Sequence, residues 1–442
     1  MKKGLLGVGI IAAVASITLT GCSNGGSSSY GKKETITFIN HRTDWETNGK
    51  WDEYIKKFNE KYPDIKVKIQ TITDYAGQIK TRMNSKEYGD LLMIPGDIKA
   101  QDYKNFFEPL GKKEELSKKY LGMNDRSYEG TSYGIPSQVN ATGMVTNMKV
   151  FKDAGIKTFP KTPEEFLKAL ETIKEKNKDV TPLYTNYAAG WTLSNWDFVK
   201  AGVSGDADFT NKMTADTAPF SDGKVMNTIY RLLYDVSKNK LIESDPTTSD
   251  WEQSKVDLAN GKIAVMQLGS WAVPQIQQAN SDNAKNIKFQ AFPVTAADGK
   301  QYMSVAGDYN YGINVHSKHK KAARKLLDWL VNESDYAKDN GGIPTVRGAE
   351  YPEALKASKE AGVQLMEETP APEGKESLFG DINDQSQLGI GSTDKEKQRI
   401  IDAAIGNSKE SFEDIMKDFN TRWANAIQSV SKKINDNREL GS

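Results

Sequence analysis

The alternation of apolar and polar positions predicts that strands and helices alternate along this chain. Residues 35–39 are rich in β-branched side chains and are predicted to form a strand. Between residues 51 and 62 large apolar side chains recur every three to four positions, which is one face of a helix, and residues 65–70 alternate as a second strand. A strand, a helix and a strand in this order form a βαβ unit, which predicts a parallel sheet with a right-handed crossover.

The same alternation continues toward the end of the chain. Short buried strands are predicted at residues 91–94 and 263–266, and amphipathic helices at residues 320–332 and 412–427. Residues 162–165 (TPEE) combine an N-cap threonine, a first-turn proline and the glutamate of a capping box, so they predict a helix N-terminus. The pattern therefore predicts an α/β fold with at least two sheets. Since one core rarely grows beyond roughly 250–300 residues, two lobes are expected in a chain of 442 residues.

The first residues read as a targeting segment rather than as part of the fold. A basic start and a short apolar run end at Leu19-Thr20-Gly21-Cys22, which is typical of a signal peptide over residues 1–21 and resembles the bacterial lipobox. A signal peptide cut nearby, with Cys22 incidental, is the alternative. The lipobox is favoured because Cys22 is the only cysteine in the chain. We therefore expect a lipidated Cys22, a Gly/Ser-rich tether over residues 22–32, and a protein held on the outer face of the membrane of a single-membrane bacterium.

Composition narrows the function classes. A single cysteine excludes an internal disulfide framework, and Lys plus Arg equals Asp plus Glu at 59 each, which does not suggest nucleic-acid binding. We find no HExxH, no GxSxG and no phosphate-binding glycine loop, and we expect no metal or cofactor. Asp206 and Asp208 lie in an acidic loop that lacks the spacing of a calcium-binding EF-hand, so a solvated loop is favoured. A glycosidase pair of carboxylates has no positive sign in the sequence.

Aromatic and polar residues share several non-periodic loops, and this mixture is typical of a carbohydrate site. Flat rings cover the C–H faces of a sugar, while polar side chains satisfy the hydroxyl rim, because a hydroxyl buried without a partner costs roughly 1–3 kcal/mol. Ligands of open α/β sheets bind at the carboxyl ends of strands, where the loops at His41 and Trp271 are expected to lie. Trp51, Trp329 and Trp423 fit helical patterns and are predicted to be core residues. Trp191, Trp196 and Trp271 lie in loops and are better ligand candidates.

Segments in a fixed order resemble the family 1 extracellular solute-binding proteins of ABC importers, which include maltose-binding protein. The segments that carry the resemblance are residues 35–70, Tyr133-Gly134-Ile135-Pro136, residues 147–156, 160–166 and 258–266, Gly269-Ser270-Trp271, residues 317–330 and Gly341-Gly342-Ile343-Pro344. The resemblance implies two α/β lobes joined by crossing strands, with a ligand cleft and a hinge between them. By analogy, lobe one covers residues 33–136 plus 303–344, and lobe two covers residues 137–302 plus 345–442.

The resemblance also implies a set of cleft residues, of which Trp271 is the strongest. The residues carried over to this chain are His41, Arg42, Asp44, Trp45, Asp97, Gln138, Asn140, Asn186, Trp191, Trp196, Trp271, Asp308 and Tyr309. The chain departs from common patterns at Asn40-His41-Arg42 and at Ser137-Gln138, so the resemblance does not transfer the identity of the ligand.

The expected function is that of a monomeric, lipid-anchored receptor that captures an oligosaccharide and delivers it to an ABC importer permease. Two alternatives remain at this point. One keeps the receptor role but changes the solute to a polyamine, a phosphate ester or an amino-acid derivative. The other is a surface-anchored glycan hydrolase.

Overall fold

The computed structural model describes residues 33–73, 75–96 and 98–440. The expected signal peptide, Cys22 and the tether lie outside the described residues, and so does Asp97, one of the predicted site residues. Within the described part, no helix combines the length and the apolar character that crossing a bilayer requires.

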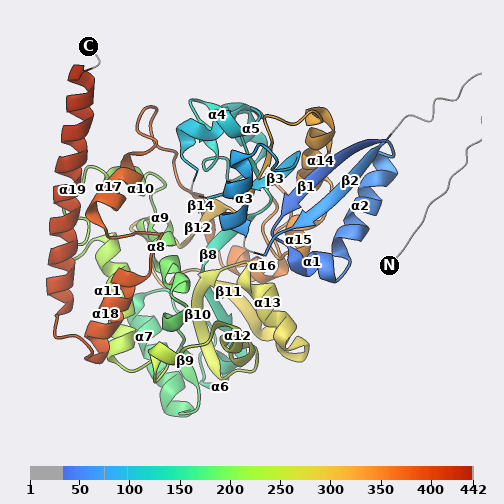
Figure 1. The fold of residues 1–442 in the computed structure, drawn as a ribbon. Coiled ribbons are helices and arrows are strands. Elements are labelled where there is room, and N and C mark those ends of the chain that lie inside the picture. The colour runs from blue at the N-terminus through green and yellow to red at the C-terminus, as the bar shows by residue number, and fades with distance from the viewer. Residues whose placement is uncertain (1–32, 74, 97, 441–442) are drawn as a thin grey trace, which may run out of the picture.

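The first sheet has five strands and contains the predicted βαβ unit (Figure 1). Its strands, in spatial order, are β2 (Ile65–Thr71), β1 (Glu34–Asn40), β3 (Leu91–Ile94), β13 (Asn310–Ile313) and β7 (Ile135–Pro136). β1 is parallel to β2 and to β3, as predicted, whereas β13 runs antiparallel to both of its neighbours. A late segment of the chain is therefore built into the centre of the N-terminal sheet.

The second sheet has six strands, and a small third sheet lies apart from it. Its members are β14 (Gln364–Glu367), β12 (Tyr302–Gly307), β8 (Val139–Asn147), β10 (Ile263–Gly269), β9 (Thr181–Leu183) and β11 (Ile287–Gln290), and the small sheet is β4 (Gly111–Lys112), β6 (Thr131–Ser132) and β5 (Ser127–Tyr128). The predicted two-lobed α/β fold is confirmed. The expected lobe boundaries stay a prediction, although β12 pairs with β8 and so belongs to the second sheet.

Helices cover both sheets. Those of the first lobe are α1 (Thr43–Thr47), α2 (Lys50–Lys61), α3 (Tyr75–Asn84), α4 (Tyr103–Phe106), α5 (Lys113–Lys119), α14 (Lys320–Asn332) and α15 (Tyr336–Asp339). Those of the second lobe are α6 (Met148–Asp153), α7 (Pro163–Lys176), α8 (Asn195–Phe198), α9 (Lys200–Ser204), α10 (Phe209–Met213), α11 (Val225–Lys238), α12 (Trp251–Ala259), α13 (Ala272–Ala279), α16 (Glu353–Glu360), α17 (Leu378–Ser386), α18 (Lys395–Ile405) and α19 (Phe412–Leu440).

The helix signals of the sequence are confirmed in detail. α14 has the predicted bounds, and α7 begins directly after the predicted N-cap, Thr162, whose hydroxyl accepts the Glu165 N–H at 3.2 Å. The return contact of the capping box is shifted by one residue, because the Glu165 carboxylate accepts the N–H of Lys161 at 2.9 Å. Both contacts satisfy N–H groups that have no partner inside the helix.

Three segments connect the two lobes and hydrogen-bond to one another. Ser137-Gln138 joins β7 to β8, Asp308-Tyr309 joins β12 to β13, and residues 341–345 follow α15. The Ser137 N–H donates to the Tyr309 carbonyl at 2.8 Å, and the Asp308 N–H donates to the Gln138 carbonyl at 2.9 Å. Val139 and Ile343 exchange two further bonds at 2.9 Å. These crossing segments form a narrow, ordered connection of the kind that serves as a hinge.

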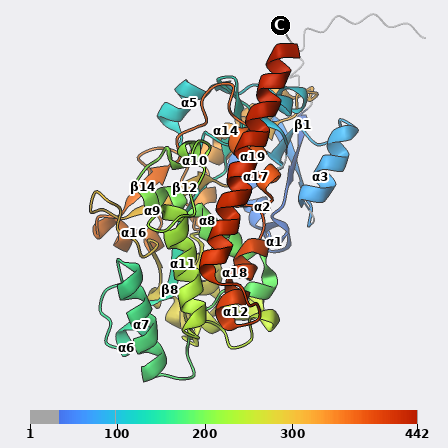
Figure 2. The same cartoon turned by 90° about the vertical axis from the view of Figure 1, so that its left-hand side faces the viewer.

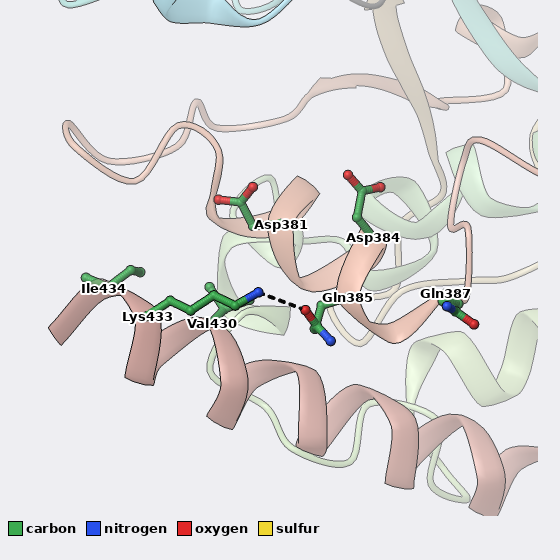
Figure 3. Close-up of a pocket in the computed structure, with 7 residues that line it drawn as sticks. All are labelled: Asp381, Asp384, Gln385, Gln387, Val430, Lys433 and Ile434. Atoms are coloured by element: carbon green, nitrogen blue, oxygen red, sulfur yellow. Dashed lines mark hydrogen bonds between the residues drawn. The ribbon is translucent and has the colours of Figure 1, made fainter. Parts of the chain in front are cut away.

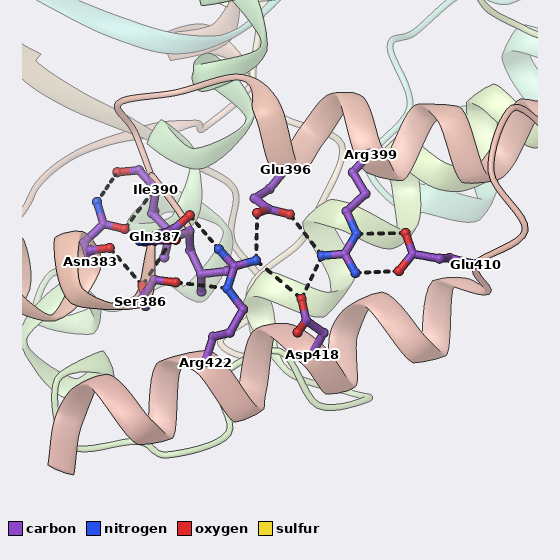
Figure 4. A network of polar contacts seen from close by, with 10 residues as sticks. Asn383, Ser386, Gln387, Ile390, Glu396, Arg399, Glu410, Asp418 and Arg422 are labelled. Atoms are coloured by element: carbon purple, nitrogen blue, oxygen red, sulfur yellow. Dashed lines mark hydrogen bonds and ion pairs between the residues drawn. The ribbon is translucent and has the colours of Figure 1, made fainter. Parts of the chain in front are cut away.

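The C-terminal helix α19 belongs to the second lobe. It runs along the edge of the molecule away from the N-terminal sheet (Figure 1) and across the second lobe in the side view (Figure 2). An ion-pair network holds it to α18 (Figure 4): Arg399 binds Glu410 through two bonds and Asp418 through one at 2.7 Å, while Arg422 binds Glu396 at 2.7 Å. This network rigidifies the lobe rather than the connection between the lobes.

Candidate ligand-binding cleft

Two adjoining hollows lie between the lobes, and Asn140 and Trp271 line both of them. The His41 half has a volume of about 560 Å³ and is lined by His41, Arg42, Asp44, Trp45, Asn48, Asn140, Trp271, Pro274, Gln275, Gln278, Asp308, Asp339 and Asn340. The Lys200 half has a volume of about 620 Å³ and is lined by Gly96, Gly122, Asn124, Asp125, Arg126, Asn140, Thr142, Asn195, Phe198, Lys200, Gly269, Trp271, Ser304, Val305, Ala306, Gly307, Glu367 and Glu368. Together they form one cleft beside the crossing segments.

A further hollow of about 550 Å³ lies between α17 and α19 (Figure 3). It is lined by residues of these two helices and the adjoining Gln387, and Lys433 donates to the Gln385 side chain across it at 3.1 Å. None of its lining residues also lines the cleft. It is therefore a separate surface feature of the second lobe.

The first lobe presents a rigid cation to the cleft. Arg42 follows β1 and binds the Asp44 carboxylate through two hydrogen bonds, from Nε at 2.8 Å and from Nη2 at 2.6 Å. Its Nη1 donates to the Asn340 side chain at 2.5 Å, and its guanidinium lies 4.2 Å from the Trp45 ring centre. Because a forked guanidinium held in this way loses little freedom on binding, Arg42 offers preorganised polar contacts to a ligand.

His41 adds an uncharged ring to the same side of the cleft. It stacks on Tyr309 with ring centres 4.3 Å apart, and its Nδ1 lies 2.9 Å from the Met93 sulfur. Burial lowers the pKa of His41 to about 4, against the opposing influence of Asp308. Near neutral pH the imidazole is therefore uncharged, and it can both donate and accept a hydrogen bond.

Amides and a carboxylate connect the crossing segments to the cleft floor. The Gln138 side chain donates to Asp308 at 2.9 Å and to Asn140 at 3.1 Å, and its carbonyl accepts from Asn340 at 2.7 Å. Gln138 itself is fully buried, so it positions its partners rather than contacting a ligand in this conformation. Asp308 and Asn140 remain at the cleft surface.

The second lobe has a tryptophan cluster, which consists of Trp191, Trp251 and Trp271, and of these three only Trp271 lines the cleft. The three ring centres lie 5.2–5.9 Å apart. Trp271 follows the carboxyl end of β10, as the sequence predicts, and faces both halves of the cleft. Trp191 is 47% exposed, which is unusual for a large apolar side chain. An exposed ring supported by two others is a suitable surface for a sugar face.

Two predicted site residues lie in the core of the second lobe instead. Trp196 is 1% exposed and packs on Phe292, and Asn186 is 1% exposed with its amide 3.2 Å from the Met266 sulfur. Neither lines the cleft. Both share a segment with Trp191, and the sequence does not show which side of that segment turns inward. Trp45, also predicted, lines the cleft, although it is only 5% exposed.

Several cleft residues were missed by the sequence interpretation. They are Arg126, Phe198, Lys200, Gln275, Gln278, Asn340, Glu367 and Glu368. They come from segments far apart in the chain, and none belongs to a motif, so only the fold brings them together. Phe198 is 41% exposed, and the fact that it directly follows Trp196-Asp197 in an aromatic segment was the one available signal.

The acidic loop is satisfied by protein groups. Asp206 accepts from the Asp208 N–H at 2.9 Å and from the Lys212 ammonium, and Asp208 accepts from Asn211 at 2.8 Å. In the part of the chain that the structure describes, no group of three or more His, Cys, Asp or Glu side chains is arranged to hold a metal ion.

Two α/β lobes, a hinge of crossing segments and a polar and aromatic cleft between them define a solute-binding protein. Residues 44–337 match the family model described as bacterial extracellular solute-binding protein, and the chain belongs to this family. The resemblance seen in the sequence is thereby confirmed.

Similar proteins are binding proteins of the same architecture. The multiple sugar-binding protein of Streptococcus mutans is 29% identical over 343 residues, which are 75% of this chain and 78% of that protein. A manno-oligosaccharide-specific solute-binding protein from Bifidobacterium animalis subsp. lactis, solved with mannotriose, is 39% identical with a TM-score of 0.82, covering 91% of this chain and 96% of that one. A second binding protein from that organism, solved with mannobiose, is 39% identical with a TM-score of 0.81, covering 90% and 95%.

Proposed function

We propose that the protein captures an oligosaccharide in the cleft and delivers it to the permease of an ABC importer. The observation that carries the proposal is the position of Trp271, whose ring faces both halves of the cleft opposite the polar groups of the first lobe. A ring on the second lobe, with Asn140 beside it, and Arg42 and His41 on the first lobe match the apolar faces and the hydroxyl rim of a sugar. The two halves, of about 560 and 620 Å³, leave room for more than one ring.

Manno-oligosaccharides are the first candidates. The proposal rests on a relative with 39% identity that is described as manno-oligosaccharide specific and was solved with mannotriose. Identity at that level across 91% of the chain supports a shared ligand class more strongly than fold alone. The cleft residues themselves do not distinguish mannose from other hexoses.

Capture in this proposal is a closure of the lobes about the crossing segments. The boundaries we propose for the lobes are therefore the crossings themselves, at Ser137-Gln138, Asp308-Tyr309 and residues 341–345. A ligand that contacts both lobes stabilises the closed form by the difference in its contacts between the two forms. The closed, loaded form is the one that the permease would recognise.

The proposal includes a lipid anchor at Cys22 and a location on the outer face of the cell membrane. Its support is the lipobox-like sequence Leu19-Thr20-Gly21-Cys22 and the tether that follows it. Replacing Cys22 by serine is expected to abolish the incorporation of labelled palmitate, because the lipid attaches through the cysteine sulfur. Mass spectrometry of the wild-type N-terminus would then show no diacylglycerol if the anchor is wrong.

A binding screen tests the function directly. The purified Cys22→Ser chain is titrated by calorimetry and by melting temperature with mannobiose, mannotriose, raffinose and spermidine, and each mixture is then analysed for products. Saturable binding of a sugar without turnover is expected. Release of shorter sugars would assign the protein to the hydrolases, and binding of spermidine that survives Trp271→Ala would assign it a cationic solute instead. Trp271→Phe is the matched control, because it keeps an aromatic face.

A further inference from the structure

The Lys200 half of the cleft ends at a wall shared with a neighbouring hollow. That hollow has a volume of about 770 Å³, and its other lining residues include Lys112, Ser117 and Arg347. The two hollows have three lining residues in common, Asn124, Glu367 and Glu368. These residues, which we call the partition, therefore stand between the cleft and the outer hollow.

The first lobe holds the partition from one side. The Glu367 carboxylate accepts the Gly122 N–H at 2.6 Å and the Arg347 guanidinium at 2.7 Å. Arg347 is itself fixed on α5, because its Nε donates to the Ser117 carbonyl at 2.7 Å. The Asn124 amide donates to the backbone carbonyl of Glu368 at 2.5 Å.

The second lobe holds the partition from the other side. The Glu368 carboxylate accepts from the Lys200 ammonium at 2.9 Å and from the Thr210 hydroxyl at 2.6 Å. The next residue, Thr369, donates its N–H to the Ala207 carbonyl at 2.7 Å. The Lys200 side chain is 9% exposed, so its ion pair with Glu368 is largely shielded from water. Contacts on both sides leave the partition little freedom to move aside for a ligand.

The opposite end of the cleft is built differently. Its lining residues Asp44, Gln275 and Gln278 are exposed, and the Asp44 side chain has 59% of its surface open to water. Gln275 and Gln278 lie on α13 and carry long side chains that can move without loss of packing. The cleft is therefore walled at the Lys200 end and open at the His41 end.

We propose that the partition receives the terminal ring of the bound oligosaccharide, so that the protein recognises one end of the sugar chain. The inference rests on the proposed function. The terminal ring meets Asn124, Glu367 and Glu368, with Asp125 and Arg126 beside it, whereas the other end of the chain passes out between Asp44 and Gln278. A substituent on the terminal ring is refused, because it would have to displace groups that hold both lobes.

The test compares the two ends of one ligand. Mannotriose, or the sugar of the screen that binds most tightly, is prepared unlabelled, as a benzyl glycoside at the reducing end, and with the same benzyl group as an ether on the ring at the non-reducing end, so that every ring stays closed. One labelled form is expected to bind the Cys22→Ser protein at least about tenfold more weakly than the unlabelled sugar, as a steric misfit in a pocket imposes. The other labelled form is expected to bind within about threefold of it.

Variants then locate the cause. Asn124→Ala combined with Glu367→Ala shortens the partition and is expected to recover most of the affinity for the refused form. Gln278→Ala, at the open end, is the matched control and is expected to recover none. If the double variant does not fold by circular dichroism, the comparison of the two labelled forms on the unchanged partition still decides.

The outcomes are distinct. Equal binding of both labelled forms would overturn the inference while leaving the proposed function intact. Refusal of both forms would also overturn it, since the whole ligand would then be enclosed. Absence of binding by every unlabelled sugar would overturn the proposed function itself, and the inference with it.

Discussion

Each lobe contains an aromatic cluster. The cluster of the first lobe is buried, whereas that of the second lobe is partly exposed. The first-lobe aromatic cluster consists of Trp45, Trp51, Tyr54 and Tyr336, each no more than 5% exposed. The second-lobe tryptophan cluster exposes 47% of Trp191. The ring spacing is almost the same, 5.0–6.2 Å in the first and 5.2–5.9 Å in the second. Contact geometry between rings therefore does not separate a core from a binding surface, whereas exposure beside a cleft does.

The largest expected effect is on stability and comes from the first-lobe cluster. Trp51→Ala leaves a cavity against Trp45 and Tyr54 and is expected to lower the free energy of unfolding by about 3–5 kcal/mol. Urea titration followed by circular dichroism measures the loss. The folded fraction is expected to bind ligand within about twofold of the parent, and Trp51→Phe is expected to lose less stability. A large change in affinity with unchanged stability would reverse the roles assigned to the two clusters.

The second prediction concerns affinity and the second-lobe cluster. Trp271→Ala is expected to weaken sugar binding about a hundredfold, or about 2.7 kcal/mol, because the ring faces both halves of the cleft. Calorimetry gives the affinity, and urea titration is expected to show a smaller loss of stability than for Trp51→Ala. Trp271→Phe is expected to retain part of the binding. If the alanine variant binds as tightly as the parent, the cleft assignment fails.

The third prediction concerns His41, which lines the cleft but is largely buried, and its effect on how stability depends on pH. Burial lowers the pKa of His41 to about 4, so below about pH 6.5 the unfolded chain takes up a proton that the folded protein refuses. This contribution to stability is complete above about pH 6.5 and is lost as the pH falls toward 4. Between pH 7 and pH 5 the loss is expected to be about 1–2 kcal/mol greater in the parent than in His41→Gln. Urea titrations at both pH values measure the free energy of unfolding. If the parent and His41→Gln lose the same free energy of unfolding between pH 7 and pH 5, His41 titrates normally.

The smallest expected effect is that of Trp191→Ala. Because about half of this side chain already faces water and its ring lies outside the two hollows, its loss is expected to weaken sugar binding about fivefold, or about 1 kcal/mol. Stability is expected to change by less than about 1 kcal/mol. A trisaccharide should be affected more than a disaccharide if Trp191 extends the platform of Trp271, and calorimetry with both sugars distinguishes the two cases.

The sequence predicts the frame of the molecule well because the frame depends on local patterns. β1, α2 and β2 follow from periodicity, α7 from its N-cap residue, and Trp271 from its place after a strand. In each case the residues that carry the pattern are close in sequence to the element or residue that they predict. The fate of Trp51 as a core residue follows from the same helical pattern.

The site is predicted less well because it depends on contacts between distant segments. Trp191 and Trp196 lie in one loop segment with similar composition, yet one is 47% exposed and the other 1%. What separates them is the core of the second lobe, where Trp196 packs on Phe292. Likewise, Lys200 and Glu368 meet across 168 residues, and neither shows a local sign of its partner.

The position of β13 in the first sheet affects the order in which the parts of the protein can fold. β13 pairs with β3, so that Asn310 lies opposite Ile94. Most of the residues between these two in the sequence belong to the second lobe. Because the proposed signal peptide exports the chain with its N-terminus first, β3 reaches the outside before this neighbour does. During that interval the N-terminal half-sheet has an unpaired, fully apolar edge strand, a hazard for aggregation. Assembly of the first lobe is thus a late event with high contact order, which favours slow folding and makes a holding chaperone useful before the binding protein is complete.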